Sequence, residues 1–533
     1  MTIRCFFLRR CTSTVYKVGL IVKMSVFKVR HCLSWCQTDL LIGEIMWLSR
    51  SIIIVLVIII FPIIALASEI LKVGAFGHYR KGFDPLKAYS DPHLATIACL
   101  HKRLVKIGQK GWPVSSLAKT WRISGDRLEY QFTLSDTQNV VAADVAYTFQ
   151  RILASSSNAF NKKLLESLLD KERTLDEQID SRAKKFTFYL KSRYAPFMHL
   201  LTSPELAIVK KGVKGLTGDY RIETIERDKS FRLVRVSSSS YFFNKIHLDV
   251  NLNFSDAQRL LDSRKYDVLL GIPPLFSKDL RIPLGYLDQR THQYFPGQLH
   301  LAKNKKALQD RAFRIALRRL VQAAVSDWLV NKENFIHSFN LVPKGLLLPS
   351  YYIKERKEVS SNLMNKLREQ WKAHLDRYGV KIWLPEFYLD ESLRSHIESR
   401  IKKISSNVEV VLAPFRKISD KMKSGYFDII AGEGKTLFRD PDSFLIMWEH
   451  NFPPFLPFLG RDLLRNIEKA RFIENKRTRL EKYGKIIRSF EDDEWVIPMF
   501  NMREPVIYRK DLIMPDPAFS HPETICSVGK KAL

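Results

Sequence analysis

Apolar and polar side chains alternate most regularly in residues 128–134, which read LEYQFTL. A period of two is typical of a strand that buries one face. The turn residues Gly125 and Asp126 come just before it, so the pattern predicts a hairpin in which 121–123 pairs with 128–134.

A helix is predicted directly after this hairpin. Val145, Phe149 and Ile152 follow one another at intervals of four and three residues, which places them on one helical face. Asp144 precedes them, and a carboxylate in the first turn favours the positive end of the helix dipole.

A longer helix is predicted over Asp310–Leu329, where apolar side chains repeat on one face. Arg311, Arg314 and Arg318 lie off that face, which predicts that they are solvated. The aromatic side chains Trp112, Trp121 and Trp383 are expected in the core, because indoles are largely buried on average.

Strands and helices alternate between residues 381 and 431. The expected order is strand 381–384, helix 393–404, strand 408–412, helix 418–423 and strand 427–431. Such an order implies parallel strands joined by right-handed crossovers, and it places the chain in the α/β class.

Several of these segments also resemble a known family. The run SLAKTWRISGDRLEYQFTL, the helix AADVAYTFQRIL and the later MKSGYFDIIAGEG with DPDSF are similar to motifs of the bacterial extracellular solute-binding proteins of family 5, the oligopeptide-binding type. The resemblance covers roughly residues 69–515. The chain departs from the pattern in a short loop at 135–141 and at Val141, where the family has a helix-capping threonine worth about 1 kcal/mol.

The resemblance implies a two-lobed, periplasmic-binding-protein-like type II fold with mixed sheets, whose hinge lets the lobes close over a ligand. On this basis we expect a first lobe over 68–292, which includes an extra subdomain. A second lobe is expected over 293–496, and residues 497–533 are expected to return to the first.

The N-terminal region contains an apolar run from Ile52 to Ala67, preceded by Arg50 and ending in small residues. This is the plan of a secretory signal peptide, here assigned to 46–67. An uncleaved membrane anchor is the alternative, although Pro62 interrupts the run. Residues 1–45 fit poorly in front of it, which suggests either a spurious extension, with Met46 as the true start, or a long N-terminus.

A cleaved chain would be periplasmic, and it would keep only two cysteines, Cys99 and Cys526. They could form a disulfide in an oxidising compartment, or remain two buried thiols. The net charge of +30 comes from basic residues spread along the sequence, which favours a solvated surface over nucleic-acid binding.

The ligand site implied by the family lies near the first strand and before the Asp-Pro turn at 440–441. Peptide-binding members hold the ligand's ammonium group with an acidic residue, and that position, counted back from Pro441, is Leu437 here. Asp440 itself is expected to have a structural role in the turn. The candidate ligand-binding residues are Phe76, Gly77, Glu433, Gly434, Leu437 and Arg439.

The expected function is that of a monomeric periplasmic protein that captures a peptide or similar small solute for the inner-membrane permease of an ABC importer. The missing acidic anchor leaves two alternatives, a non-peptide ligand (anionic, metal complex or haem) or a sensor or scaffold without a transport role. The sequence lacks the G-x-S-x-G, H-E-x-x-H and P-loop motifs, so we expect no enzyme activity, no metal site and no resident cofactor.

Overall fold

A computed structural model describes the chain between Ile70 and Lys530, with gaps. The described residues are 70–76, 82–87, 91–108, 111–136, 139–155, 162–175, 183–210, 217–226, 229–236, 241–277, 279–290, 295–330, 332, 334–343, 345–352, 365, 369, 371–372, 375–386, 389–403, 405–433, 438–446, 449, 461–515 and 525–530. The predicted signal peptide 46–67 and the start at Met46 lie outside them. Among the described residues, none of the helices is both long and apolar enough to span a bilayer.

The first sheet has seven strands in the order β11-β18-β10-β1-β9-β8-β7. Their bounds are β1 Ile70–Phe76, β7 Tyr220–Glu226, β8 Ser230–Arg235, β9 Lys245–Leu252, β10 Val268–Leu270, β11 Tyr286–Arg290 and β18 Pro505–Arg509. The sheet is mixed, as expected, because β1 runs parallel to β9 and β10 while β18 is antiparallel to β10 and β11.

A separate three-stranded sheet confirms the predicted hairpin. Strand β4 (Ala118–Ile123) pairs antiparallel with β5 (Glu129–Leu134), which also pairs with β6 (Lys185–Tyr189). The predicted helix follows as α4 (Ala142–Ala154). Its start lacks a side-chain cap at Val141, but the Asp144 carboxylate accepts a hydrogen bond from the Val141 N–H at 3.1 Å. The lost threonine cap is therefore partly replaced from inside the helix.

The second sheet has six strands in the order β13-β17-β12-β16-β14-β15. Their bounds are β12 Phe295–Leu301, β13 Phe335–His337, β14 Val380–Pro385, β15 Val408–Ala413, β16 Ile429–Glu433 and β17 Val496–Met502. Strand β14 is parallel to both β15 and β16, which confirms the predicted crossovers.

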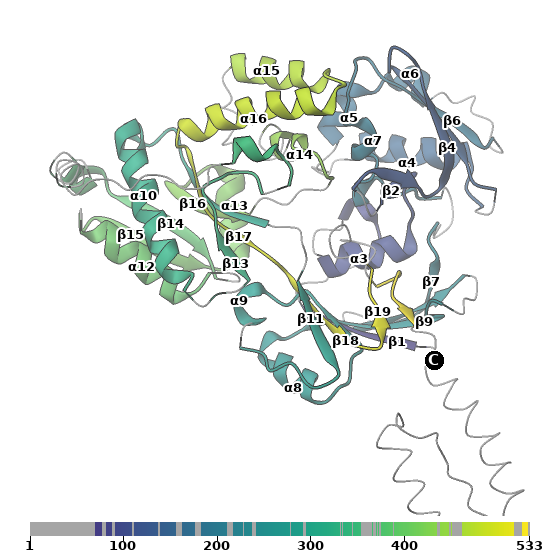
Figure 1. The fold of residues 1–533 in the computed structure, drawn as a ribbon, viewed down its shortest axis with the longest axis horizontal. Coiled ribbons are helices and arrows are strands. Elements are labelled where there is room, and N and C mark those ends of the chain that lie inside the picture. The colour runs from purple at the N-terminus through teal and green to yellow at the C-terminus, as the bar shows by residue number, and fades with distance from the viewer. Residues whose placement is uncertain are drawn as a thin grey trace, which may run out of the picture. The chain divides into compact units, whose positions relative to one another are not determined.

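Helices cover both faces of the second sheet (Figure 1). Helices α10 (Arg311–Trp328) and α12 (Glu391–Lys402) pack against each other, and α13 (Phe415–Ser424) contacts β14 and β16. Along β14, Ile382 and Leu384 enter the core under α10 and α12. Trp383 belongs to the core beside α13. Burial on both faces explains why this strand is apolar from Ile382 to Pro385.

Two arginines of α10 contradict the prediction that they are solvated. Arg314 is 5% exposed, donates hydrogen bonds to the carbonyls of Leu308 and Gln309, and stacks 3.8 Å from the Trp495 ring. Arg318 is 3% exposed and lies 2.7 Å from the Glu494 carboxylate. Apolar periodicity misses such residues because their buried partners come from distant segments of the chain.

The chain passes back to the first sheet after Met502, since β17 pairs in the second sheet and β18 in the first. The sequence predicts this return at residue 497, whereas Val496–Met502 still belongs to the second sheet. The division into lobes stays a proposal.

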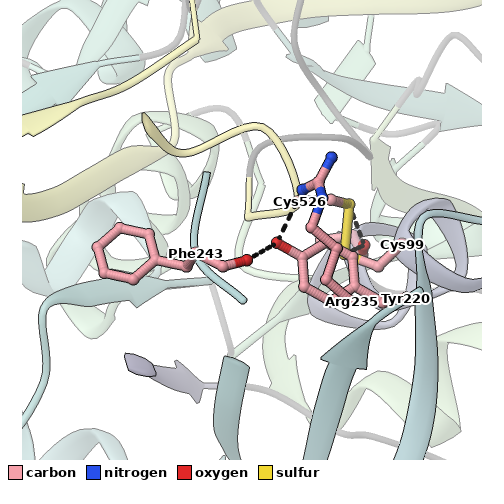
Figure 2. Close-up of a disulfide and its surroundings, with 6 residues drawn as sticks. Cys99, Tyr220, Arg235, Phe243 and Cys526 are labelled. Atoms are coloured by element: carbon pink, nitrogen blue, oxygen red, sulfur yellow. Dashed lines mark hydrogen bonds between the residues drawn. A yellow bond between two sulfur atoms is a disulfide. The ribbon is translucent and has the colours of Figure 1, made fainter. Parts of the chain in front are cut away.

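A disulfide joins Cys99 to Cys526, which settles the alternative left open by the sequence. Figure 2 shows it beside Tyr220, whose hydroxyl donates to the Phe243 carbonyl at 2.7 Å and accepts from Arg235 at 3.2 Å. Gly218 lies against the same helix, and a Cβ there would come within 2.1 Å of the Cys99 carbonyl oxygen. The close approach therefore requires glycine.

Short elements complete the described part of the chain. The helices are α3 Asp91–Leu100, α5 Lys162–Leu168, α6 Lys171–Thr174, α7 Phe197–Leu200, α8 Ala257–Asp262, α9 Pro274–Ser277, α14 Asp442–Ile446, α15 Arg461–Arg471 and α16 Lys476–Asp492. The remaining strands are β2 Val105–Ile107, β3 Pro113–Ser115, β19 Leu512–Ile513 and β20 Gly529–Lys530.

Candidate ligand site

Phe76, a predicted ligand contact, is fully buried in this structure. Its ring stacks on Phe254 at 5.2 Å and packs in the core with residues of α8. The pairing register of β1 shifts between Gly74 and Phe76, which turns the aromatic ring toward this core. A Cβ atom on Gly74 would lie 2.7 Å from the Leu269 side chain, so the absence of a side chain at Gly74 leaves room for the core packing.

Of the other predicted residues, only Glu433 and Arg439 lie in the described part of the chain. Gly77, Gly434 and Leu437 lie outside the described residues, so their assignment to the site stays a prediction. Glu433 ends β16, where its backbone pairs with Gly297 of β12. Arg439 is exposed, although partial burial lowers the pKa of its guanidinium.

Asp440 holds the turn that follows Arg439, which fits the structural role expected for it. Its carboxylate is 3% exposed, accepts from the Asp442 N–H at 3.1 Å and lies 3.3 Å from Nη2 of Arg479. Burial raises the pKa of Asp440 to about 6, against the opposing effect of Arg479.

Asp442, at the start of α14, is the centre of a buried charge network. Arg471 donates from Nε to both oxygens of Asp442, at 3.0 and 3.1 Å, and from Nη2 to Glu449 at 2.8 Å. The Tyr194 hydroxyl donates to Asp442 at 2.5 Å. Burial opposes the charge on Arg471, but the two carboxylates outweigh it and raise the pKa of Arg471 above its ordinary value.

The segment 438–446 belongs to two cores at once. Phe438 and Ile446 pack with the apolar residues of the three-stranded sheet, whereas Phe444 and Leu445 pack with those of the second sheet. The network of Asp442 lies between these two sets, close to where α14 and α16 appear in Figure 1. Residues 438–446 therefore join the three-stranded sheet to the second lobe.

Trp112 lies nearby, in the turn before β3, and it contradicts the expectation of a core indole. Its side chain is 50% exposed, with Nζ of Lys476 4.0 Å from the ring centroid and the His199 ring at 5.9 Å. Trp383, by contrast, is 7% exposed, as expected, and Trp121 is partly buried against the core of the three-stranded sheet. Only the sequence position of Trp112 in a turn could have indicated its exposure.

His199 of α7 lies beside Trp112, with the two ring centroids 5.9 Å apart. The residue is 6% exposed, and its Nδ1 has no hydrogen-bond partner in the described part of the chain. Burial, with the positive charges of Lys476, Arg479 and Arg439, lowers the pKa of His199 to about 4. The imidazole is therefore neutral at pH 7.

A surface hollow of about 530 Å³ lies elsewhere on α16, lined by Tyr351, Lys485, Arg488, Asp492 and Asp493 among others. Its two basic and two acidic side chains balance one another.

Residues 113–323 match the family model described as bacterial extracellular solute-binding proteins, family 5 Middle. The resemblance to family 5 is confirmed. The family match begins one residue after Trp112 and includes both the hairpin and α4, the segments on which the resemblance was based. No curated protein matches the chain.

Solved structures share the two-lobed fold of periplasmic binding proteins. The Helicobacter pylori periplasmic binding protein DppA, in complex with the peptide STSA, has a TM-score of 0.72 at 16% identity and covers 87% of this chain and 98% of its own. A dipeptide-binding protein of Pseudoalteromonas sp. SM9913, with Met-Leu, has a TM-score of 0.71 at 14% identity over 87% and 100%. AgaA of A. tumefaciens R10, with agropinic acid, has a TM-score of 0.70 at 16% identity over 87% and 99%.

Proposed function

We propose that the protein is the periplasmic solute-binding component of an ABC importer, which captures a peptide or similar small solute between two lobes and delivers it to a membrane permease. The observation that carries this proposal is the family match at 113–323 within a fold shared over 87% of the chain with periplasmic binding proteins. The two large sheets, between which the chain passes from β17 to β18, support a division into two lobes.

Two further features support a periplasmic location. The disulfide between Cys99 and Cys526 suits an oxidising compartment, because cytosolic thiols are kept reduced. The apolar run that ends at Ala67 suits export with cleavage after that residue. The secreted chain would then begin at Ser68 and act as a monomer.

A second candidate keeps the same role with a ligand other than a peptide. The acidic anchor expected for a peptide ammonium is replaced by Leu437, and Arg439 adds positive charge to the same segment. AgaA, whose structure holds agropinic acid, has the same fold and supports a non-peptide solute for this chain. Among the described residues, no group of three or more His, Cys, Asp or Glu side chains could hold a metal, so nothing there favours metal delivery.

The experiment is to purify the protein from the periplasm of cells that express the whole chain, and to identify by native mass spectrometry any solute that it carries. We expect a chain beginning at Ser68 with one bound solute, whose removal and readdition change the radius of gyration in small-angle scattering. A protein that stays in the cytosol, or that binds no solute from a periplasmic extract, would contradict the proposal.

A further inference from the structure

The outer face of α13 carries more positive than negative charge. Arg416, Lys417 and Lys423 are exposed, and Lys421 is half-buried. None of these four side chains forms an ion pair within the described part of the chain. The exposed Asp420 is the one acidic residue of the helix, so four basic side chains against one carboxylate give α13 a net charge of +3.

Part of this charge is gathered around the indole of Trp383. Nζ lies 4.2 Å from the ring centroid for Lys421, 4.8 Å for Lys381 and 5.1 Å for Lys417. The electron-rich face of the ring attracts each ammonium group, but lysines four residues apart on a helix repel each other. A negatively charged partner would relieve this repulsion.

The charges on the strands beside α13 are matched. Lys381 at the start of β14 pairs with Glu409 of β15 at 2.7 Å. Lys305, just beyond the end of β12, pairs with Asp428 at 2.7 Å. The unmatched positive charge therefore belongs to α13 itself.

An exposed aromatic side chain lies next to these lysines and is independent of their charge. Gly425 ends α13 in the left-handed region, and Tyr426, which follows it, is 80% exposed. Nζ of Lys421 donates to the carbonyl of Tyr426 at 3.4 Å, so the tyrosine lies beside the basic face. A phenol ring with an apolar body and a polar tip suits the boundary between water and lipid headgroups.

This end of α13 lies away from the predicted ligand site. Strands β14, β15 and β16 are parallel, and Tyr426 precedes β16, at the edge of the sheet where these strands begin. Glu433 ends β16, at the edge where they finish. A partner that covers Tyr426 would therefore leave the predicted ligand site free.

The geometry points to a membrane-contact surface: we propose that the outer face of α13, together with Tyr426, binds the anionic headgroups of a phospholipid membrane. Basic side chains near a negatively charged leaflet each add to its attraction, and an aromatic side chain beside them adds an interfacial contact. Separate charges along the outside of a helix suit many headgroups better than a single carboxylate. The choice of a membrane rests on the proposed function, which brings the protein to a membrane permease.

The test is co-sedimentation of the periplasm-purified protein with vesicles, either of phosphatidylcholine alone or of phosphatidylcholine and phosphatidylglycerol in equal parts. We expect binding to the phosphatidylglycerol vesicles, and we expect added salt to weaken it because salt screens the charges. The double variant Lys417→Gln/Lys423→Gln removes two exposed charges and should weaken binding about tenfold. Asp420→Asn should strengthen it about threefold, because it removes the opposing charge.

The matched control is Lys469→Gln/Lys485→Gln, which removes two exposed lysines from α15 and α16 and should bind as the wild type does. Equal binding of both kinds of vesicle by the wild type would overturn the inference. An equal loss in the two double variants would also overturn it, since the attraction would then belong to the whole protein. Inner-membrane vesicles that bind the protein only until protease strips them would assign α13 to an acidic protein instead.

Failure of this inference is distinguishable from failure of the proposed function. A protein that carries a solute but does not bind phosphatidylglycerol vesicles refutes the membrane contact alone. A protein that binds these vesicles through α13 but carries no solute refutes the proposed function alone.

Discussion

Two charged clusters lie on neighbouring helices and are built differently. The Arg471 cluster (Tyr194, Asp442, Glu449 and Arg471) is almost wholly buried, with side-chain exposures of 9% for Arg471 and 0% for Asp442. Its arginine binds both carboxylates directly. The Lys476 cluster (Trp112, His199 and Lys476) reaches the surface, where Nζ of Lys476 lies 4.0 Å from the centroid of the half-exposed Trp112 ring.

The difference separates a cluster that folding requires from one that it does not require. A buried charge is tolerated only where partners satisfy it, so every contact in the Arg471 cluster is a condition for folding. A half-exposed cation such as Lys476 costs little free energy, because water screens its charge. Three substitutions or conditions test this distinction.

The largest expected effect is that of Arg471→Met. Removal of the guanidinium leaves Asp442 and Glu449 without their partner, and one broken buried pair costs about 3–5 kcal/mol. Guanidinium unfolding followed by circular dichroism should show this loss. Arg465→Met, on the exposed face of the same helix, is the control and should change stability by less than about 0.5 kcal/mol. Equal stability of Arg471→Met and the wild type would show that the network is not structural.

Acid should destabilise the protein by an intermediate amount. Burial lowers the pKa of His101 and His199 to about 4 and that of His300 to about 3, so their stabilising effect is full above pH 6.5 and is lost as the pH falls toward 4. Asp440, whose pKa is raised to about 6, acts in the opposite direction and gains as the pH falls through that value.

Near pH 5 these four side chains together take up about two protons when the protein unfolds. The free energy of unfolding should therefore fall by about 2–3 kcal/mol for each pH unit. Unfolding in guanidinium at pH 7, 6 and 5 measures this slope. The variant Asp440→Asn cannot take up the proton that stabilises the folded protein as the pH falls, so the slope should be steeper in this variant. A free energy of unfolding that is constant between pH 7 and pH 5 would refute the assignment of neutral, buried histidines.

The smallest effect is expected in the Lys476 cluster. Trp112→Ala and Lys476→Met should each change the free energy of unfolding by no more than about 1 kcal/mol, because both side chains are partly solvated. Trp383→Ala, which empties a buried position, should cost about 3–5 kcal/mol. Thermal unfolding of the three variants measures these changes. A large loss of stability in Trp112→Ala would show that this cluster has a structural role.

Local patterns predict most of the regular elements. The hairpin β4–β5, the helix α4 and the parallel strands β14, β15 and β16 all follow from periods that a few consecutive residues contain. Local patterns do not predict the burial of Arg314 and Arg318, because their partners Trp495 and Glu494 lie far along the chain. Neither did the sequence decide whether Cys99 and Cys526 are bonded.

The candidate site could be predicted only in part. The family resemblance made Arg439 a candidate, which stays a prediction, and the Asp-Pro turn indicated the structural role of Asp440. It did not indicate Phe76 as a core residue, since a one-residue shift in register decides which face the ring takes. The sequence predicted Trp112 wrongly as a core residue and did not indicate His199 or Lys476, because only the tertiary fold brings a turn, a short helix and the start of α16 together.

The bond joins Cys99 to Cys526 across a sequence separation of 427, which is most of the folded body. A protease that cuts one exposed loop inside this span would leave both fragments covalently attached. Such a nicked molecule would migrate as an intact chain on a non-reducing gel and separate into two bands only after reduction. The cross-link therefore protects the integrity of the molecule against a single cut, an advantage for any chain that works outside the cytosol.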